Sequence, residues 1–277
     1  MLRPRAILPG VELFPVRTPT LPPATHTNSY ALGQRALLLV EPSTPYDDER
    51  RAWLEWARAL AGQSRTILGV LLTHHHVDHG SAAGLFARAL DVPLLAHEAT
   101  LTRTADLEGV TVRPLRDGET LTIDDTRWIA LHTPGHAPGH VCLWEPGSRV
   151  LVAGDMVANG STILVPPDDD GDMGDYLAQL VRLQSLGAST MLPAHGEPID
   201  DPATLLAYYV AHRLERERKV LAAWRSLRTS LAREPEPAEL VPVAYADTPT
   251  QLWPLARASL IAHLVKLRRE GRLVVGS

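Results

Sequence analysis

Residues 71–80 are Leu-Leu-Thr-His-His-His-Val-Asp-His-Gly, an apolar run followed by a cluster of imidazoles around one carboxylate. The pattern H-x-H-x-D-H at the end of a strand places several nitrogen and oxygen donors in a small volume, as a metal site requires. Because alternate residues of an extended segment point the same way, His74 and His76 can converge on one ion. Asp78 and His79 lie past the turn and can face a second ion. A histidine-rich surface loop fits a single histidine but fits this pattern poorly.

Three later polar residues follow apolar runs in the same manner. They are His136 in the segment Thr133–His140, Asp155 after Val152–Gly154, and His195 after Leu192–Ala194. Each stands in a turn rich in Gly or Pro, where a rigid scaffold positions ligands at its edge. Together with residues 74–79, they are the strongest indication of a metal centre.

The composition is that of a globular protein. The chain has 277 residues, 45% of them hydrophobic, and a formal net charge of −5, so it can bury a sizeable core. No apolar run approaches the roughly 18–20 residues of a membrane helix. Pro9 and Gly10 interrupt any signal-peptide core after Arg3 and Arg5, so we expect a cytoplasmic protein without a membrane partner. Cys142 lies in an apolar run and is expected to be a small buried side chain.

Short apolar segments bounded by Pro, Gly and polar residues recur through the first 200 residues and predict strands. They are Val11–Val16, Ser29–Leu32, Ala36–Val40, Ile67–Leu72, Pro93–Ala96, Trp128–His132, His140–Trp144 and Arg149–Ala153. Helical periodicity over Asp48–Ala61, Gly80–Leu90 and Asp175–Ser185 alternates with them. This alternation predicts a layered α/β architecture. The acidic run Asp168–Asp172 does not match a calcium loop and predicts a loop that caps the next helix.

The pattern changes near Pro202, where a long charged helix is predicted over Pro202–Ser226. After a Pro-rich break, a short helix is predicted from about Ala238 and a longer one over Leu252–Arg269. A strand over Arg272–Val275 is predicted to follow Gly271. Helices followed by a strand at a glycine turn are the outline of a winged-helix module.

The C-terminal part also differs in charge. Residues 205–277 carry 12 Lys and Arg against 7 Asp and Glu, whereas residues 1–204 carry 15 against 25. A basic module beside an acidic body can contact a polyanion, but a solvated helix face or a dimer contact explains the same charges. Arg213, Arg216 and Arg218 lie on several helix faces and alternate with Glu215 and Glu217, which weakens the prediction of a single basic patch.

The metal motifs, in their order along the chain, resemble those of the metallo-β-lactamase superfamily, over roughly residues 10–200. The resemblance implies an α/β fold in which an αββα sandwich carries the metals at one edge of its sheets. Residues 1–201 would form this catalytic domain, and residues 202–277 a small, mostly helical winged-helix-like domain.

The resemblance also assigns the ligands. His74, His76 and His136 would bind a first ion, Asp78, His79 and His195 a second, and Asp155 would bridge both. The nucleophile would be a bridging hydroxide held between the ions by Asp78 and Asp155. Five imidazoles and two carboxylates suit two Zn²⁺ ions, and Fe or Mn stay open because ligand type alone does not fix the metal.

Other polar residues near these motifs have expected roles of their own. Asn159, Ser161 and Tyr176 follow the bridging aspartate and are candidate substrate-binding residues. The remaining histidines near the motifs are not expected to be ligands, and His97, His132 and His140 are expected to form hydrogen bonds around the site.

The fold alone does not determine the substrate. The segment after Asp155 and the winged-helix-like tail resemble a lactamase-β-like subgroup that includes an endoribonuclease, which implies cleavage of single-stranded RNA phosphodiesters. A glyoxalase II-like thioesterase acting on a small thioester is the alternative, since it shares the metal residues and a helical extension. A non-catalytic DNA-binding regulator is a third hypothesis. Structural zinc sites are usually closed four-ligand cages, whereas the donor set predicted here leaves open positions, which weakens this hypothesis. A homo-oligomer is also possible.

Overall fold

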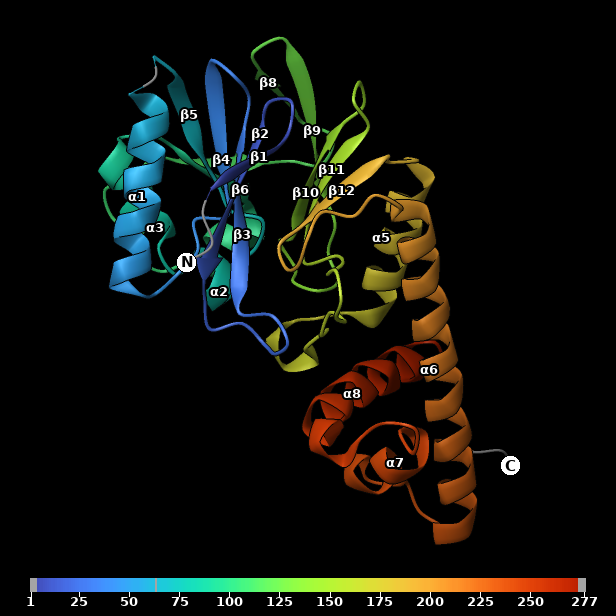
Figure 1. Cartoon of the computed structure of the whole chain (residues 1–277). Coiled ribbons are helices and arrows are strands. Elements are labelled where there is room, and N and C mark those ends of the chain that lie inside the picture. The colour runs from blue at the N-terminus through green and yellow to red at the C-terminus, as the bar shows by residue number, and fades with distance from the viewer. Residues whose placement is uncertain (1–3, 63, 274–277) are drawn as a thin grey trace. The chain divides into compact units, whose positions relative to one another are not determined.

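The computed structural model describes residues 4–62 and 64–273, and within this part of the chain the strands form a seven-stranded and a five-stranded sheet. The first contains β1 (Arg5–Leu8), β2 (Val11–Arg17), β3 (His26–Leu32), β4 (Ala36–Val40), β5 (Thr66–Leu71), β6 (Leu94–His97) and β7 (Val112–Leu115). The second contains β8 (Thr120–Ile123), β9 (Thr126–His132), β10 (Val141–Glu145), β11 (Val150–Gly154) and β12 (Thr190–Pro193). These sheets, with the helices beside them (Figure 1), confirm the predicted α/β fold class.

The helices of the described chain fall between and after these strands. They are α1 (Asp47–Ala61), α2 (Val77–Gly80), α3 (Ala83–Leu90), α4 (Glu98–Leu101), α5 (Met173–Ser185), α6 (Pro202–Leu231), α7 (Pro237–Ala244) and α8 (Trp253–Arg269), with short 3-10 turns η1 (Pro167–Asp169) and η2 (Thr250–Leu252).

The topology brings the ends of several strands to one edge. In the first sheet β1 to β4 pair antiparallel, and β4 to β7 pair parallel. In the second, β8 to β11 pair antiparallel, and β12 runs parallel to β11. The carboxyl ends of parallel strands are the usual place for polar functional residues. Glu41 follows β4, Asp155 follows β11, and His195 follows β12.

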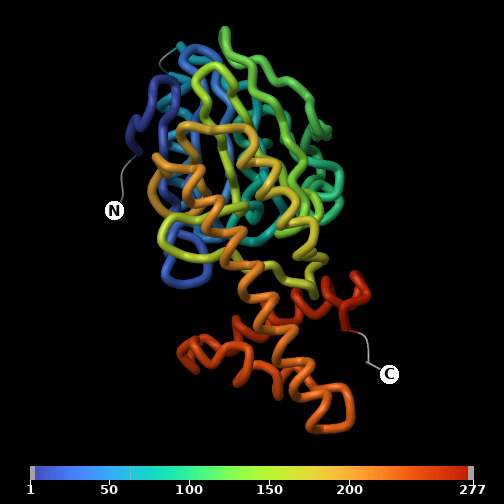
Figure 2. The backbone as a smooth tube through the Cα atoms, turned by 90° about the vertical axis from the view of Figure 1, so that its right-hand side faces the viewer, coloured from blue at the N-terminus to red at the C-terminus, as the bar shows by residue number. Residues whose placement is uncertain are grey.

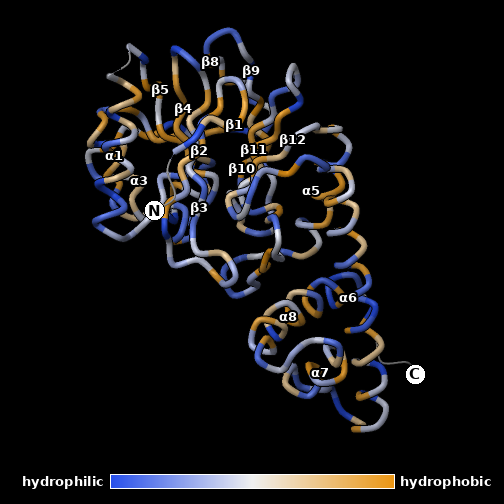
Figure 3. Tube along the Cα trace, in the orientation of Figure 1, coloured by the Kyte–Doolittle hydropathy of each residue, from blue (hydrophilic) through white to orange (hydrophobic). Residues whose placement is uncertain are grey.

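One apolar layer joins the two sheets and another covers the outer face of the first. Leu38 and Leu143 belong to the layer between the sheets, whereas Leu37, the neighbour of Leu38 on β4, points to the opposite face. There α1 and α3 cover the sheet, and the rings of Trp53 and Phe86 stack 4.1 Å apart. Figure 3 shows hydrophobic residues concentrated along the strands and hydrophilic residues on many connecting loops.

The differences from the predicted elements are local. The predicted helix Gly80–Leu90 is divided, because the chain leaves helical geometry at Ala82 between α2 and α3. Strands β1, β7, β8 and β12 are absent from the predicted strands. Each has only four residues, and several residues of β7 and β8 are exposed, so the local apolar signal is weak. Cys142, the one cysteine of the sequence, is buried, as expected.

The chain divides into two compact units. The sandwich unit comprises the chain up to Thr133, Gly139–Thr162 and Ala188–Pro202, and the helical unit comprises Pro134–Pro138, Ile163–Gly187 and the chain from Ala203. The predicted domains, residues 1–201 and 202–277, stay a prediction. No helix in the described ranges combines the length and the hydropathy needed to cross a membrane.

The helical unit has its own core. Trp224 of α6, Leu240 of α7 and Leu260 of α8 belong to one buried cluster. α6 is one continuous helix (Figure 2) and extends to Leu231, beyond the predicted end, until Ala232 adopts a left-handed φ of 55°. As expected of the acidic loop, Asp172 caps α5 by accepting hydrogen bonds from the N–H groups of Gly174 and Asp175. The second half of the predicted strand Arg272–Val275 lies outside the described residues, and Arg272 and Leu273 are not in a strand.

Candidate metal centre

The histidine motif begins where β5 ends. The Thr73 carbonyl accepts a hydrogen bond from the Val141 N–H at 3.0 Å, so the loop after β5 is fastened to the start of β10. Short helix α2 then turns the chain, and His79 becomes fully buried. The rings of His74 and His76 lie nearly perpendicular, with His74 Nε2 3.0 Å from His76 Nδ1. The alternation expected of an extended segment therefore brings these two imidazoles together.

A second group of donors surrounds His79. Its Nε2 lies 3.6 Å from Asp155 Oδ1 and 3.8 Å from Asp78 Oδ1. His195 Nε2 lies 3.4 Å from the same Asp155 oxygen and 3.6 Å from Asp78 Oδ2. Four residues from three separate segments of the chain therefore meet within the sandwich unit. They are the residues assigned from the sequence to a second ion and a bridging aspartate, and that assignment stays a prediction.

These separations fit a shared cation better than hydrogen bonds. Most of them exceed the usual 2.7–3.2 Å range of an N–H···O bond. Two ligand atoms of one tetrahedral Zn²⁺, each about 2.0–2.1 Å from the ion, lie roughly 3.4 Å apart. In addition, both ring nitrogens of His79 are buried without a hydrogen bond among the described residues, which is costly unless another group occupies them. The donor set therefore fits a divalent metal ion.

The electrostatics of the cluster reflect its opposite charges. Burial lowers the pKa of the His79 imidazole, but the carboxylates of Asp155, Glu41 and Asp78 outweigh burial and raise that pKa well above the ordinary value. Burial likewise opposes ionisation of Asp155, but His195 and His79 hold its pKa well below the usual range. Asp155 is thus charged at neutral pH, and a metal ion would replace protons on the imidazoles.

Two further buried residues, Glu41 and His140, contact members of the cluster. Glu41 is 1% exposed, and its Oε2 lies 3.3 Å from His79 Nδ1 while its Oε1 accepts a hydrogen bond from the Thr73 hydroxyl. His140 accepts a hydrogen bond at 3.0 Å from the Asp155 N–H and contacts the Thr133 hydroxyl at 2.8 Å. Such partners fix the orientation and basicity of ligands. His140 agrees with the sequence expectation, whereas the sequence analysis missed Glu41.

Of the other residues selected from the sequence, His136 and Tyr176 belong to the helical unit, and His97 and His132 belong to the sandwich unit. His136 belongs to the helical unit, with its Nδ1 2.7 Å from the Leu164 carbonyl oxygen, and its place at the first ion stays a prediction. Tyr176 is fully buried in the same unit, so its predicted contact with substrate also stays a prediction. His97 and His132 stack their rings 3.9 Å apart.

A small cavity of about 250 Å³ adjoins His195 in the sandwich unit. Asn159 and Ser161, two of the predicted substrate-binding residues, line it together with His26, which the sequence analysis did not select. The Asn159 N–H donates to the His195 carbonyl at 3.0 Å, so Asn159 also holds the turn that carries this histidine.

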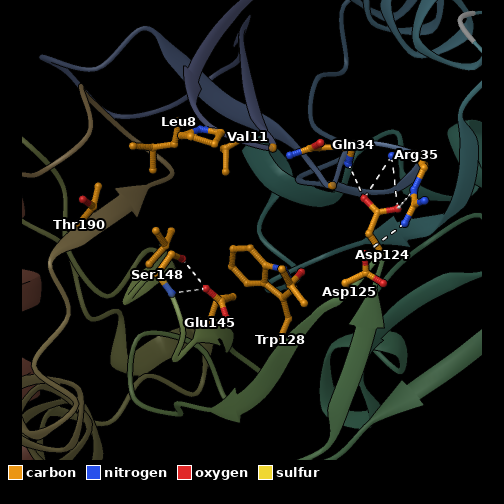
Figure 4. A pocket seen from close by; sticks show the side chains of 15 residues that line it. Leu8, Val11, Gln34, Arg35, Asp124, Asp125, Trp128, Glu145, Ser148 and Thr190 are labelled. Carbon is orange, nitrogen blue, oxygen red and sulfur yellow. Dashed lines mark hydrogen bonds and ion pairs between the residues drawn. The ribbon is translucent and has the colours of Figure 1, made fainter.

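A larger cavity of about 630 Å³ lies between turns at the other ends of the strands. Figure 4 shows Asp124 turned toward the backbone of Gln34 and Arg35, and Glu145 turned toward Ser148. These two carboxylates are already hydrogen-bonded, and none of the described residues that line the cavity is a histidine, so it does not compete with the cluster as a metal site.

The fold and the cluster agree with comparisons to known proteins. A family model described as metallo-beta-lactamase superfamily matches residues 22–195, more than half of the chain. The chain belongs to the metallo-β-lactamase superfamily. A second model, described as a beta-lactamase associated winged helix domain, matches residues 237–277 and confirms the predicted C-terminal module. The protein is therefore a hydrolase of this superfamily with a metal-binding site.

Relatives cover most of the chain. A beta-lactamase-like protein 2 homolog from Drosophila melanogaster is 26% identical, over 90% of this chain and 84% of that protein. An atrochrysone carboxyl ACP thioesterase from Aspergillus chevalieri is 29% identical, over 73% of this chain and 61% of that protein.

Solved structures agree with the fold. A metallo-beta-lactamase family protein from Thermus thermophilus is 28% identical with a TM-score of 0.70, covering 98% of this chain and 97% of that one. A protein solved in a di-iron-bound form is 27% identical with a TM-score of 0.54, covering 69% of this chain and 96% of that one.

Proposed function

We propose that the protein hydrolyses acyl thioesters with the help of two divalent cations. The observation that carries the proposal is the cluster of the partly buried Asp78 with the buried His79, Asp155 and His195, beside a cavity of about 250 Å³. The thioesterase from Aspergillus chevalieri supports the substrate class. The histidine-rich donor set suits zinc, while the relative in a di-iron-bound form keeps iron as an alternative.

The chain's residues hold and orient the reacting groups. Bound divalent cations would polarise the carbonyl under attack and lower the pKa of a water molecule. Asp78 and Asp155 supply the negative charge that holds the cations, and Glu41 keeps the His79 ring in place. His26 and Ser161 line the adjoining cavity, which is smaller than the roughly 300–1,000 Å³ of pockets for drug-sized ligands. We therefore expect a short acyl group there.

The charges of the helical unit favour a thioester over RNA. Arg216 and Lys219 each lie 2.8 Å from carboxylate oxygens of Asp247, and Arg233 lies 2.6 Å from Glu239. Cations that already face carboxylates release fewer counterions when they meet phosphates, so they contribute less to binding a nucleic acid.

Cleavage of single-stranded RNA is the second candidate. The balance of 12 basic against 7 acidic residues over 205–277, together with the winged-helix match, supports it. A non-catalytic regulator, in contrast, does not agree with membership of a hydrolase superfamily. The cytoplasmic location and a homo-oligomer stay predictions.

The test compares substrates on the full chain loaded with zinc. Release of thiol from an N-acetylcysteamine acyl thioester and from lactoylglutathione is measured beside cleavage of labelled single-stranded RNA, each with and without a chelator. Asp155→Asn is the site variant, and Asp125→Asn is the matched control, because the Asp125 side chain is 93% exposed.

We expect chelator-sensitive thiol release that Asp155→Asn abolishes and Asp125→Asn retains. RNA cleavage with intact thioesters would overturn the thioester proposal in favour of the second candidate.

A further inference from the structure

A buried arginine on α6 is the first step of the argument. Arg213 is 3% exposed, although it belongs to a helix that carries many solvated charges. Burying a guanidinium is costly unless it finds partners, so its contacts indicate why it is there. It donates a hydrogen bond to the Ile163 carbonyl, and its Cζ lies 5.4 Å from the centre of the Tyr176 ring, within cation–π range.

The segment of Ile163 and Leu164, which contacts Arg213, also contacts the predicted metal ligand His136. The carbonyl of Leu164, the residue after Ile163, lies 2.7 Å from His136 Nδ1. A carbonyl oxygen only accepts, so Nδ1 of His136 carries the proton and Nε2 carries the lone pair that a metal ligand needs. A hydrogen bond from the second ring nitrogen to a backbone carbonyl is the usual support of a metal-binding histidine.

Gly135, on the N-terminal side of His136, is also held in place by backbone contacts. The Gly135 carbonyl accepts a hydrogen bond from the Asp172 N–H at 2.8 Å. Gly135 has a φ of 131°, and a Cβ there would overlap the backbone nitrogen of Tyr176. The His136 loop is therefore packed against the start of α5, whose Tyr176 also contacts Arg213.

We propose that Arg213 is a positioning residue for the metal ligand His136, acting through the backbone of Ile163 and Leu164. The proposal rests on the predicted role of His136 as a ligand of the first ion. Every group in this series of contacts belongs to the helical unit, so α6 supports His136 through the backbone of that unit.

The experiment measures metal affinity rather than hydrolysis. The full chain is freed of metal and titrated with Zn²⁺ against a chromophoric chelator, which resolves the affinities of the two ions, and visible spectra with Co²⁺ report the coordination of each. Arg213→Met removes the guanidinium, and Arg213→Lys keeps a cation and a donor. Arg225→Met is the matched control on the exposed side of the same helix. His136→Ala identifies the ion that this histidine binds.

We expect Arg213→Met to weaken one ion about 10- to 100-fold, the usual effect of removing a residue that supports a ligand. The same ion should be lost in His136→Ala, partly retained in Arg213→Lys, and unchanged in Arg225→Met. Equal weakening of both ions with a lowered Tm would indicate a merely structural arginine and overturn the proposal. Unchanged affinities in Arg213→Met, or in His136→Ala, would overturn it as well. Because no substrate is used, these outcomes are independent of thioester hydrolysis.

Discussion

Replacing Glu41 by glutamine tests the support of the second ion. The carboxylate is 1% exposed, lies 3.3 Å from His79 Nδ1 and accepts a hydrogen bond from the Thr73 hydroxyl. Losing a residue that supports a metal-binding histidine usually costs about 1.4–2.8 kcal/mol of metal-binding free energy. With about 1.4 kcal/mol for each tenfold change, Glu41→Gln should weaken the ion bound by His79 roughly 10- to 100-fold.

The assay is the same chelator-competition titration with Zn²⁺, and the chain offers a matched control. Glu145 is also buried and accepts hydrogen bonds from Gly147 and Ser148, but it lies at the other end of the strands, beside the cavity of Figure 4. Glu145→Gln should leave both affinities unchanged. Equal losses in the two variants, or wild-type affinity in Glu41→Gln, would refute the role of Glu41 in orienting His79.

Further predictions concern stability. Burial raises the pKa of Glu217, but His263, Lys266 and Arg272 outweigh burial and lower it from 4.5 to about 2. A carboxyl with a depressed folded pKa stabilises the fold above its ordinary pKa and loses this effect as the pH falls from about 4.5 toward 2. Denaturant titrations should therefore show Glu217→Gln less stable by about 3 kcal/mol at pH 7, with most of this difference lost by pH 2; a constant difference would contradict the assignment. Gly135→Ala should lower the free energy of unfolding by about 2–6 kcal/mol, from backbone strain and overlap with Tyr176. Gly118→Ala, also at a positive φ but with nothing within 4 Å, should cost only the strain, and equal losses would contradict this reasoning. Zn²⁺ at 100 times its Kd should stabilise the chain by about 2.7 kcal/mol per ion in thermal melts, and an unchanged Tm would contradict specific binding.

Local patterns allowed much of the fold to be predicted. Strands such as Ala36–Val40 are continuous apolar runs, and burial on both faces of the first sheet explains why. Strand β7 was missed because three of its four residues are exposed and its pairing with β6 brings together segments that are distant in sequence. Weak local signals of this kind become strands only through tertiary pairing.

The candidate site likewise contains residues that local spacing reveals and one that only the folded structure reveals. His74, His76, Asp78 and His79 lie within six residues, so their spacing alone indicated a metal centre. Glu41 looks like an ordinary loop residue between Val40 and a proline, and its contact with His79 depends on the parallel pairing of β4 with β5.

Arg213 illustrates the same limit on the helical side. Helical spacing places Arg213 in the apolar stripe of α6 with Leu206 and Tyr209, which are also buried. The spacing does not reveal what receives the charge, because the contacts with Ile163 and Tyr176 join segments that are distant along the chain. Periodicity assigns residues to a helix face, but only the packing of that face decides which charges are buried.

The most direct test of a two-metal thioester hydrolase is the rate of thiol release from an acyl thioester by the metal-free chain as Zn²⁺ is added. We predict no hydrolysis without metal and a rate that rises until two equivalents are bound. Hydrolysis that does not depend on added metal, or no thiol release at two equivalents, would contradict the account.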